Sequence, residues 1–408
     1  MEQHVPGPRS VIIVGGSLAG LMHALTLLSL PSPPKVRILE RSPTALLHDQ
    51  GAGIVAGLEP QEFFAEYVRP GREIAVTSPA RHYLDHKGSV MPETVEHRAQ
   101  EMTSWDLLYH LLRWRVEGLQ SEYVKGLKED DRSKAQYENG CSVTAVESTS
   151  DGVKVTWQQK DQGEQCATAD MVIAADGASS TVRRLLQPDV QRTYVGYVAW
   201  RGTVPETELS DAAREVFVER FTFYHTTGIQ ILGYLIPGRD GTLEPGKRLF
   251  NWVWYVNYLE GSPELEDLMT GTDGKRHAIT LPVGTMKESV LKQQKAYAAK
   301  ILPPQYAEAV QKTKQPFVQA ITDVISPQNS HMDGKVLLVG DALAGFRPHT
   351  AASTGQAAYD ALTFGKWMKG EISAKTYNED VTDFAWRVQR HGVRLGQRSQ
   401  FGEHPHNG

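Results

Sequence analysis

Residues 11–20 read Val-Ile-Ile-Val-Gly-Gly-Ser-Leu-Ala-Gly, a β-branched run that leads directly into a glycine turn. Good helix formers follow at residues 21–30, and prolines at 31, 33 and 34 end that helix. Residues 36–39, Val-Arg-Ile-Leu, form the next predicted strand, with Glu40 at its end. This pattern predicts a dinucleotide-binding unit, because amides at a helix start face a pyrophosphate and the acid accepts hydrogen bonds from a ribose.

The turn departs from the usual G-x-G-x-x-G pattern, since Ser17 replaces the second glycine. The flanking strand and helix, and the placement of Glu40 after Gly20, still favour a nucleotide site. A membrane anchor or signal segment is the alternative, because residues 11–30 contain no Asp, Glu, Lys or Arg. The glycines, the single basic residue Arg9 ahead of the run and the missing stop-transfer flank argue against it.

Composition narrows the class of protein. The chain has 408 residues, 40% of them hydrophobic and 22% charged, which is ordinary for a globular protein long enough for two domains. A net charge of -5 argues against a nucleic-acid partner. The two cysteines, Cys141 and Cys166, have no C-x-x-C spacing, so we expect neither a disulfide framework nor a metal site. We expect a cytoplasmic protein without a membrane span.

Two later segments repeat the pattern of a buried strand that ends in an acid. Residues 171–177 place Asp176 at a strand end, and residues 335–341 do the same for Asp341. Pro348 then precedes a predicted helix of small residues that begins with Ala351 and Ala352, and the amides at its start would favour electron-rich oxygens. A carboxylate near a pyrophosphate is favourable only where it accepts hydrogen bonds from hydroxyls, which suggests that role for Asp341.

Glycines and aromatic residues mark other candidate contacts. Residues 50–55 read Gln-Gly-Ala-Gly-Ile-Val, where Gly53 allows either close packing against a strand or approach to a cofactor. The polar segment 125–139 is expected to be a surface loop. From residue 194 the chain is aromatic and β-rich, and such a sheet could cover a flat ligand, although an aromatic stripe is more often plain core.

The motifs, in this order and spacing, resemble those of the single-component flavoprotein aromatic hydroxylases, the family of para-hydroxybenzoate and salicylate hydroxylases. The resemblance rests on the glycine turn with Glu40 and Arg41, on Asp176 with its following glycine, and on Asp341 with Pro348. Within the family, residues 196–202, 236–239 and 347–349 look most like those of the hydroxypyridine hydroxylases.

The resemblance implies a fold and a domain arrangement. We expect an α/β protein with a Rossmann-like FAD-binding domain of the glutathione-reductase type, an inserted β-rich substrate domain and a C-terminal helix. The expected FAD-binding domain comprises residues 1–75, 105–193 and 325–375. The substrate domain comprises 76–104 and 194–324, and a helical segment covers 376–408.

The resemblance also implies an activity. We expect FAD as resident cofactor, NADH or NADPH as co-substrate, and hydroxylation of a small phenol- or hydroxypyridine-like ring by dioxygen through a flavin hydroperoxide. A homodimer is possible. A flavin oxidase, dehydrogenase or tailoring enzyme on the same fold is the main alternative, and a non-catalytic nucleotide-binding protein is another. The FAD contacts that we predict are Gly15, Gly16, Ser17, Leu18, Gly20, Glu40, Arg41, Gly53, Asp176, Asp341, Pro348, Ala351 and Ala352.

His349 and Tyr224 are the predicted catalytic residues. His349 follows Pro348 at the expected flavin edge, and an imidazole suits proton transfer near neutral pH; alternatively it only orients a loop. Tyr224 is a pocket candidate together with His225, Gln230 and Trp254. Arg201 could hold an anionic substrate or form a structural ion pair.

Overall fold

A six-stranded sheet built around β1 carries the predicted dinucleotide-binding unit. The computed structural model describes residues 7–47, 53–129, 131–160, 162–402, 404 and 406. The sheet has the order β18-β19-β11-β1-β2-β7, and only the β18–β19 pair within it is antiparallel. Its strands are β1 (Ser10–Val14), β2 (Lys35–Leu39), β7 (Gln136–Glu138), β11 (Met171–Ala174), β18 (Ser330–His331) and β19 (Val336–Leu338). Gln50, Gly51 and Ala52 of the glycine stretch lie outside the described residues, as does part of the chain end.

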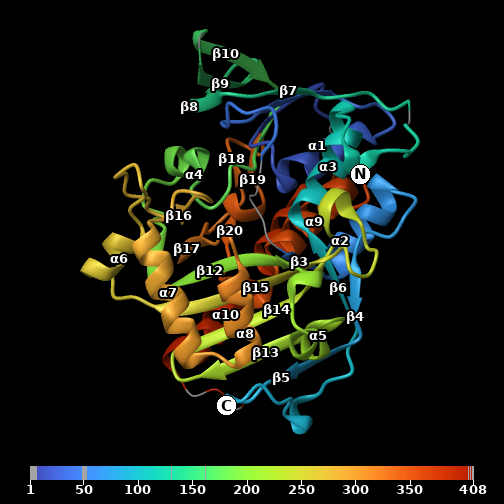
Figure 1. The fold of residues 1–408 in the computed structure, drawn as a ribbon. Coiled ribbons are helices and arrows are strands. Elements are labelled where there is room, and N and C mark those ends of the chain that lie inside the picture. Colours follow the sequence, from blue (N-terminus) through green and yellow to red (C-terminus); the bar gives the residue numbers. More distant parts are fainter. Residues whose placement is uncertain are drawn as a thin grey trace.

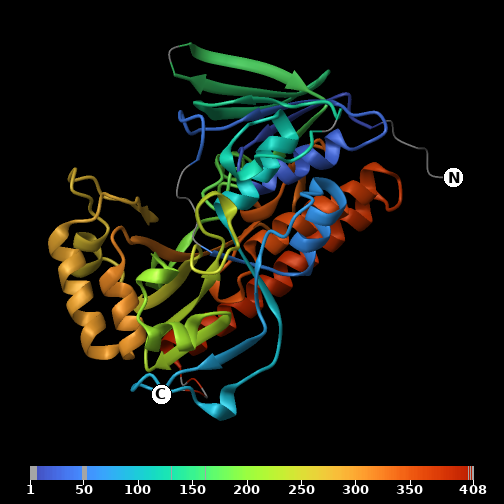
Figure 2. The ribbon, with the colours of Figure 1, turned by 45° about the vertical axis from the view of Figure 1, so that its right-hand side comes forward.

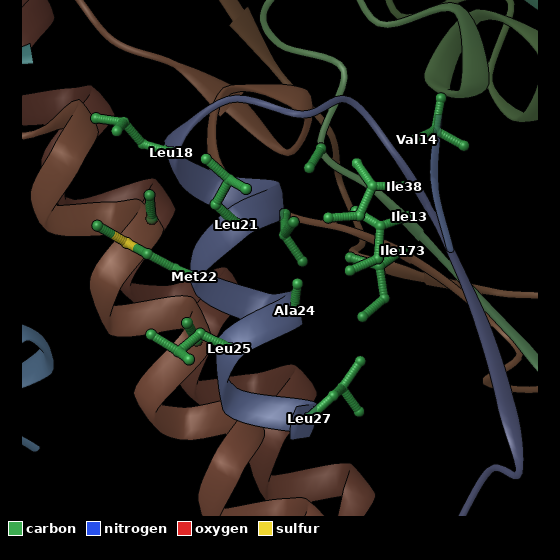
Figure 3. Packing of buried hydrophobic residues seen from close by; sticks show 14 of the residues in the cluster. Ile13, Val14, Leu18, Leu21, Met22, Ala24, Leu25, Leu27, Ile38 and Ile173 are labelled. Atoms are coloured by element: carbon green, nitrogen blue, oxygen red, sulfur yellow. The ribbon is translucent and has the colours of Figure 1, made fainter. Parts of the chain in front are cut away.

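Helix α1 (Leu18–Leu28) packs between this sheet and α9 (Ser353–Met368). It begins earlier than predicted, because the extended residue Ser17 takes the N-cap position. Figure 3 shows Ala24 and Leu27 directed toward the sheet, and Met22 toward the neighbouring helices. Both sides are covered, so the uncharged run needs no membrane to explain it. Among the described helices, none is both long and apolar enough to cross a membrane.

The polar segment 125–139 is not entirely a loop, which corrects the prediction. Its end forms β7, which pairs with β2. The charges concealed this strand because Glu138 pairs with a distant residue of the neighbouring strand: Nη2 of Arg37 donates to Oε2 of Glu138 at 2.8 Å. Tyr137 points inward, and its hydroxyl donates to the carbonyl oxygen of Gly16 at 3.0 Å. The edge strand therefore supports the glycine turn.

A second, larger sheet forms the lower half of the molecule in Figure 1. Its path is β16-β17-β12-β15-β14-β13-β5, with β20 paired to β17. The strands are β5 (Ala80–Tyr83), β12 (Thr193–Pro205), β13 (Arg220–Thr226), β14 (Ile229–Ile236), β15 (Leu249–Asn257), β16 (Thr280–Leu281), β17 (Phe317–Ile325) and β20 (Ala344–Gly345). Alternate residues of these strands face two different cores, as the period of two requires.

Helices cover the two faces of this sheet differently. On one side lie α5 (Asp211–Phe217), α6 (Pro263–Leu268), α7 (Glu288–Ile301) and α8 (Pro304–Lys312). Figure 2 shows α7 and α8 in orange on that side, and the long red helices α9 and α10 (Ala374–Phe401) on the other. The face toward α9 and α10 is therefore the one that meets the first sheet's domain.

Smaller elements complete the fold. A three-stranded meander caps the first sheet: β8 (Cys141–Thr149), β9 (Gly152–Gln159) and β10 (Gly163–Ala169). A short sheet joins β3 (Gly53–Ala56), β6 (Gln100–Ser104) and β4 (Val76–Ser78) between the two large sheets. The remaining α-helices are α2 (Leu58–Phe63), α3 (Trp105–Glu117) and α4 (Thr181–Leu186).

Candidate active site

A cavity of about 1230 Å³ lies between the larger sheet, the short β3–β6–β4 sheet and the start of α9. This volume exceeds the several hundred Å³ that a single drug-sized ligand needs. Its lining includes Asp341, Pro348 and Ala352 at one end and His225 and Tyr83 from β13 and β5. The cavity has room for a large cofactor group and a small ring together.

The three sequence motifs meet at one edge of the first sheet. They follow β1, β11 and β19, which are parallel neighbours, so their carboxyl ends lie side by side. A Cβ on Gly15 would lie 2.4 Å from the carbonyl oxygen of Ala175, and one on Gly340 would lie 2.8 Å from Cβ of Ala19. Of the three motifs, the third contributes Asp341 to the large cavity, whereas Gly15 and Asp176 are outside its lining.

The first motif presents a helix start without a side-chain cap. Ser17 is the N-cap of α1, yet its hydroxyl does not bond the first-turn amides. Oε2 of Glu40 accepts from the amide of Gly16 at 2.8 Å, and Oε1 accepts from the amide of Ser42 at 2.7 Å. Leu18 is buried and Arg41 is exposed. A Cβ on Gly20 would lie 2.0 Å from the carbonyl oxygen of Gly15, so only glycine fits there.

Asp176 in the second motif is bound to the start of α4. Its carboxylate accepts from the hydroxyl of Ser180 at 2.5 Å and from the amide of Thr181 at 2.7 Å. Burial raises the pKa of this carboxyl, and these hydrogen bonds oppose the increase. Arg183 of the same helix donates to the carbonyl oxygen of Ala342 at 2.7 Å. The second motif therefore holds the third in place.

The start of α9 forms one wall of the cavity. We expected a helix from Ala351, but this residue is left-handed (φ 51°), and α9 begins at Ser353 with Ala352 as N-cap. No side chain caps this end, in contrast to α10, where the Ser373 hydroxyl does so. Pro348, Ala351, Ala352 and Ser353 all line the cavity. Amides exposed here suit the electron-rich oxygens of a flavin ring.

Two side chains of α9 clamp the peptide groups of Gly340, a feature that the sequence analysis missed. Oδ2 of Asp360 accepts from the amide of Gly340 at 2.8 Å, and Nε2 of Gln356 donates to its carbonyl oxygen at 3.0 Å. Asp360 is fully buried, and desolvation raises its pKa to about 7. An acid inside a helix of small residues was the available signal. The clamp fixes Asp341, the next residue, whose carboxyl pKa is also raised by burial.

His349 is held on both ring nitrogens. Nδ1 lies 2.9 Å from Oε1 of Gln230, which also accepts from the hydroxyl of Ser399 at 2.6 Å. Oε1 is thus the acceptor, so Nδ1 carries the proton, and Nε2 accepts from the hydroxyl of Tyr197 at 3.1 Å. The ring stacks on Tyr255 at 4.2 Å between centroids. Desolvation, reinforced by the charge of Arg347, lowers the pKa of His349 to about 3.

The larger sheet supplies an aromatic wall. Phe223 and His225 of β13 face the cavity, whereas Tyr224 between them faces the opposite core. Trp254 also faces away and stacks on Tyr297. The prediction that Tyr224 and Trp254 line the pocket was wrong. The register of each strand determines which of its side chains face the cavity, and the sequence pattern does not reveal that register.

Two other candidates, Arg201 and Gln230, place polar groups in the lining of the cavity. Arg201 makes no ion pair with any described carboxylate, and its Nε is buried without a hydrogen-bond partner there. The phenols of Tyr234 and Tyr255 are close enough to feel its charge. The structural ion pair considered as the alternative for Arg201 is absent from the described residues.

Gly53 packs closely against a strand and also lies at the cavity. A Cβ at this position would lie 2.5 Å from the ring of Tyr234, so close packing requires glycine. Its amide donates to Oδ1 of Asn251 at 3.0 Å, and the residue also lines the cavity. The described residues contain no cluster of His, Cys, Asp and Glu side chains that could hold a metal.

The first sheet carries the glycine turn, the starts of α1 and α9 have no side-chain cap, and an aromatic cavity adjoins them. These features define the class of flavoproteins that bind FAD beside a small aromatic ring. Comparisons with known proteins agree. Residues 194–323 match a family model described as FAD binding domain-like. The curated 2,6-dihydroxypyridine 3-monooxygenase of Paenarthrobacter nicotinovorans is 31% identical over 370 residues, which cover 88% of this chain and 83% of the relative.

Solved structures give the same result. 2,6-Dihydroxypyridine-3-hydroxylase from Arthrobacter nicotinovorans has a TM-score of 0.83 at 27% identity, covering 98% of this chain and 95% of that one. Klebsiella pneumoniae HpxO complexed with FAD and uric acid shares the fold, with a TM-score of 0.70 at 17% identity over 99% and 90%. The chain belongs to the family of FAD-dependent aromatic-ring monooxygenases, and FAD is its cofactor. The resemblance, the fold class and the cofactor predicted from the motifs are confirmed.

Proposed function

We propose that this protein uses FAD, NADH or NADPH and dioxygen to hydroxylate an electron-rich hydroxypyridine or phenol ring. The observation that carries the proposal is the cavity, which runs from the start of α9 to an aromatic wall without interruption. When bound, FAD reduced by the nicotinamide would activate dioxygen. The protein supplies position, exclusion of water and electrostatics. The relatives named for 2,6-dihydroxypyridine support a ring of this kind.

The proposed cofactor contacts follow the geometry of the sheet edge. The turn of Gly15, Gly16, Ser17, Leu18 and Gly20, with Glu40 and Arg41, would hold the adenosine and pyrophosphate. Asp341 would accept hydrogen bonds from ribityl or ribose hydroxyls, and Asp176 would act by holding its loop. Gly53, Pro348, Ala351 and Ala352 would surround the flavin ring. The amides at the start of α9 would stabilise negative charge on the ring's oxygens by up to about 2 kcal/mol.

His349 is proposed to position neighbouring groups and not to act as a free base. Both of its nitrogens are already bonded, and a pKa near 3 leaves the ring neutral throughout the physiological range. Neutral His349 keeps Tyr197 and Gln230 in fixed orientations at the edge of the cavity. Arg201 is proposed to stabilise an anionic ring oxygen, because its unpaired charge is costly unless a ligand compensates it.

A substrate screen tests the activity. Purified protein loaded with FAD would be given NADH or NADPH and a panel of hydroxypyridines, phenols and fused phenolic rings. A true substrate should stimulate nicotinamide oxidation and gain one oxygen atom from labelled dioxygen. The alternative of an oxidase or dehydrogenase on the same fold would yield a product that has lost hydrogen and gained no oxygen.

The assembly and location of the protein are further proposals. A homodimer, as the family resemblance suggests, would be tested by light scattering of the FAD-loaded chain. A cytoplasmic location is supported by the free thiols of Cys141 and Cys166, the second of which is exposed. Fractionation of the native host would test it.

A further inference from the structure

His225 is a buried polar side chain whose ring nitrogens have no hydrogen-bond partner within the part of the chain that the structure describes. It lies on β13, faces the cavity and is 2% exposed. Neither Nδ1 nor Nε2 has a hydrogen-bond partner among the described residues. Leaving a buried donor or acceptor unsatisfied costs about 1–3 kcal/mol, so such groups are rare unless a ligand completes them. The position of this ring in the cavity indicates where a ligand would do so.

Neighbouring rings fix the plane of His225. His404 stacks on it with centroids 3.6 Å apart and an interplanar angle of 13°. The ring centroid of Tyr83, on β5, lies 5.4 Å from that of His225. The ring centroid of Phe223, on β13 like His225, lies 6.5 Å from it. His404 also lines the cavity. His404 therefore covers one face of the imidazole, and a ligand would form hydrogen bonds with the nitrogens at the edge of the ring.

The surroundings keep this ring uncharged. The titratable groups that face it are His404 and His406 near the chain end, His349 after β20, Arg398 on α10 and the phenol of Tyr83. Burial is the main cause that lowers the pKa of His225 well below its usual value, and the neighbouring histidines and Arg398 add to it. A neutral imidazole has one N–H donor and one nitrogen lone pair.

We propose that His225 is a catalytic residue whose unprotonated nitrogen accepts a hydrogen bond from a hydroxyl group of the substrate ring. This inference rests on the proposed function and extends it to a residue and a substrate feature. The hydrogen bond draws the hydroxyl proton toward the imidazole, which increases electron density on the ring when the ring attacks the electrophilic oxygen. The O–H bond is polarised but not broken at this step, so no proton acceptor besides His225 is required. Substrates therefore carry a free ring hydroxyl.

The experiment uses the FAD-loaded protein and two probes, 2,6-dihydroxypyridine and its dimethoxy analogue, which lacks hydroxyl hydrogens. His225→Phe keeps a flat ring that can stack on His404 but removes both nitrogens. His225→Asn and His225→Gln each return an acceptor near one nitrogen position. Tyr224→Phe, on the opposite face of the same strand, is the matched control. Equilibrium binding would be followed by flavin absorbance, and kcat and KM by NADH oxidation.

We expect His225→Phe to weaken binding of 2,6-dihydroxypyridine about tenfold, the upper range for one neutral hydrogen bond, and to lower kcat at least as much. Binding of the dimethoxy probe and the FAD content should stay unchanged, and Tm should not fall, because the variant removes buried nitrogens that have no partner among the described residues. At least one of His225→Asn and His225→Gln should recover part of the loss, and Tyr224→Phe should match the wild type. A merely structural role would weaken both probes equally.

Two results separate the inference from the proposed function. If the wild type hydroxylates a hydroxylated ring and His225→Phe does so with unchanged kcat and KM, the inference is overturned while the function stands. An equal loss of both probes overturns it in the same way. If the wild type hydroxylates no ring in the screen, the proposed function fails and the inference fails with it.

Discussion

Replacing Asp360 by Asn should change how stability depends on pH. The carboxyl is fully buried beneath the Gly340 turn, and its pKa in the folded protein is about 7. An unfolded chain has an Asp pKa of about 3.9, so the folded state binds this proton more tightly. The stabilising contribution is therefore complete below about pH 4 and is lost as pH rises through about 7. The difference corresponds to about 4 kcal/mol.

Asn at this position still offers an oxygen to the amide of Gly340, but it does not titrate. We expect the unfolding free energy of the wild type, minus that of Asp360→Asn, to fall by about 4 kcal/mol between pH 4 and pH 8. Urea unfolding at fixed FAD concentration, followed by far-ultraviolet circular dichroism, would measure it. Asp383→Asn, an exposed change on α10, is the control. A constant offset across this range would refute the reasoning.

Four further outcomes are expected. Gly20→Ala should lower retained FAD more than tenfold after dialysis, because its Cβ would meet a carbonyl oxygen 2.0 Å away. Arg201→Met should raise KM for a hydroxylated ring about tenfold, with partial recovery in Arg201→Lys; equal values in all three proteins would contradict the anion-binding role. Arg347→Met should cost about 3 kcal/mol in urea unfolding, since it leaves Asp323 without its buried partner. Between pH 5 and 9, kcat should depend on pH in the same way in the wild type and in His349→Asn, because the pKa of His349 is about 3.

The sequence predicted the nucleotide-binding half of the fold well because its signals are local. The β-branched run, the glycine turn and the acid after β2 each depend on neighbours within a few residues, and the parallel pairing of β1 with β2 follows from them. Strand β7 was missed because Glu138 is polar for a long-range reason, its pairing with Arg37. Local composition does not contain that information.

The substrate side was harder to predict. Tyr224 and His225 are adjacent in sequence, and only the register of β13 against β14 places one in the cavity and the other in the opposite core. The orientation of His349 also depends on distant partners, since Gln230 and Tyr197 come from other strands, and its neutral state depends on burial that the sequence does not reveal. Asp360 was overlooked because its role depends on contact with a turn that precedes α9.

The hydrogen bonds of His349 limit how this molecule can open. They tie the segment after β20 to β12 and β14, and Ser399 of α10 joins the same group through Gln230. Swinging the large sheet away from α9 would break these bonds together with the Arg347–Asp323 ion pair, at a cost of several kcal/mol. The substrate ring should therefore enter, and the product leave, through small local displacements at the rim of the cavity, while the larger sheet and α9 keep their relative positions.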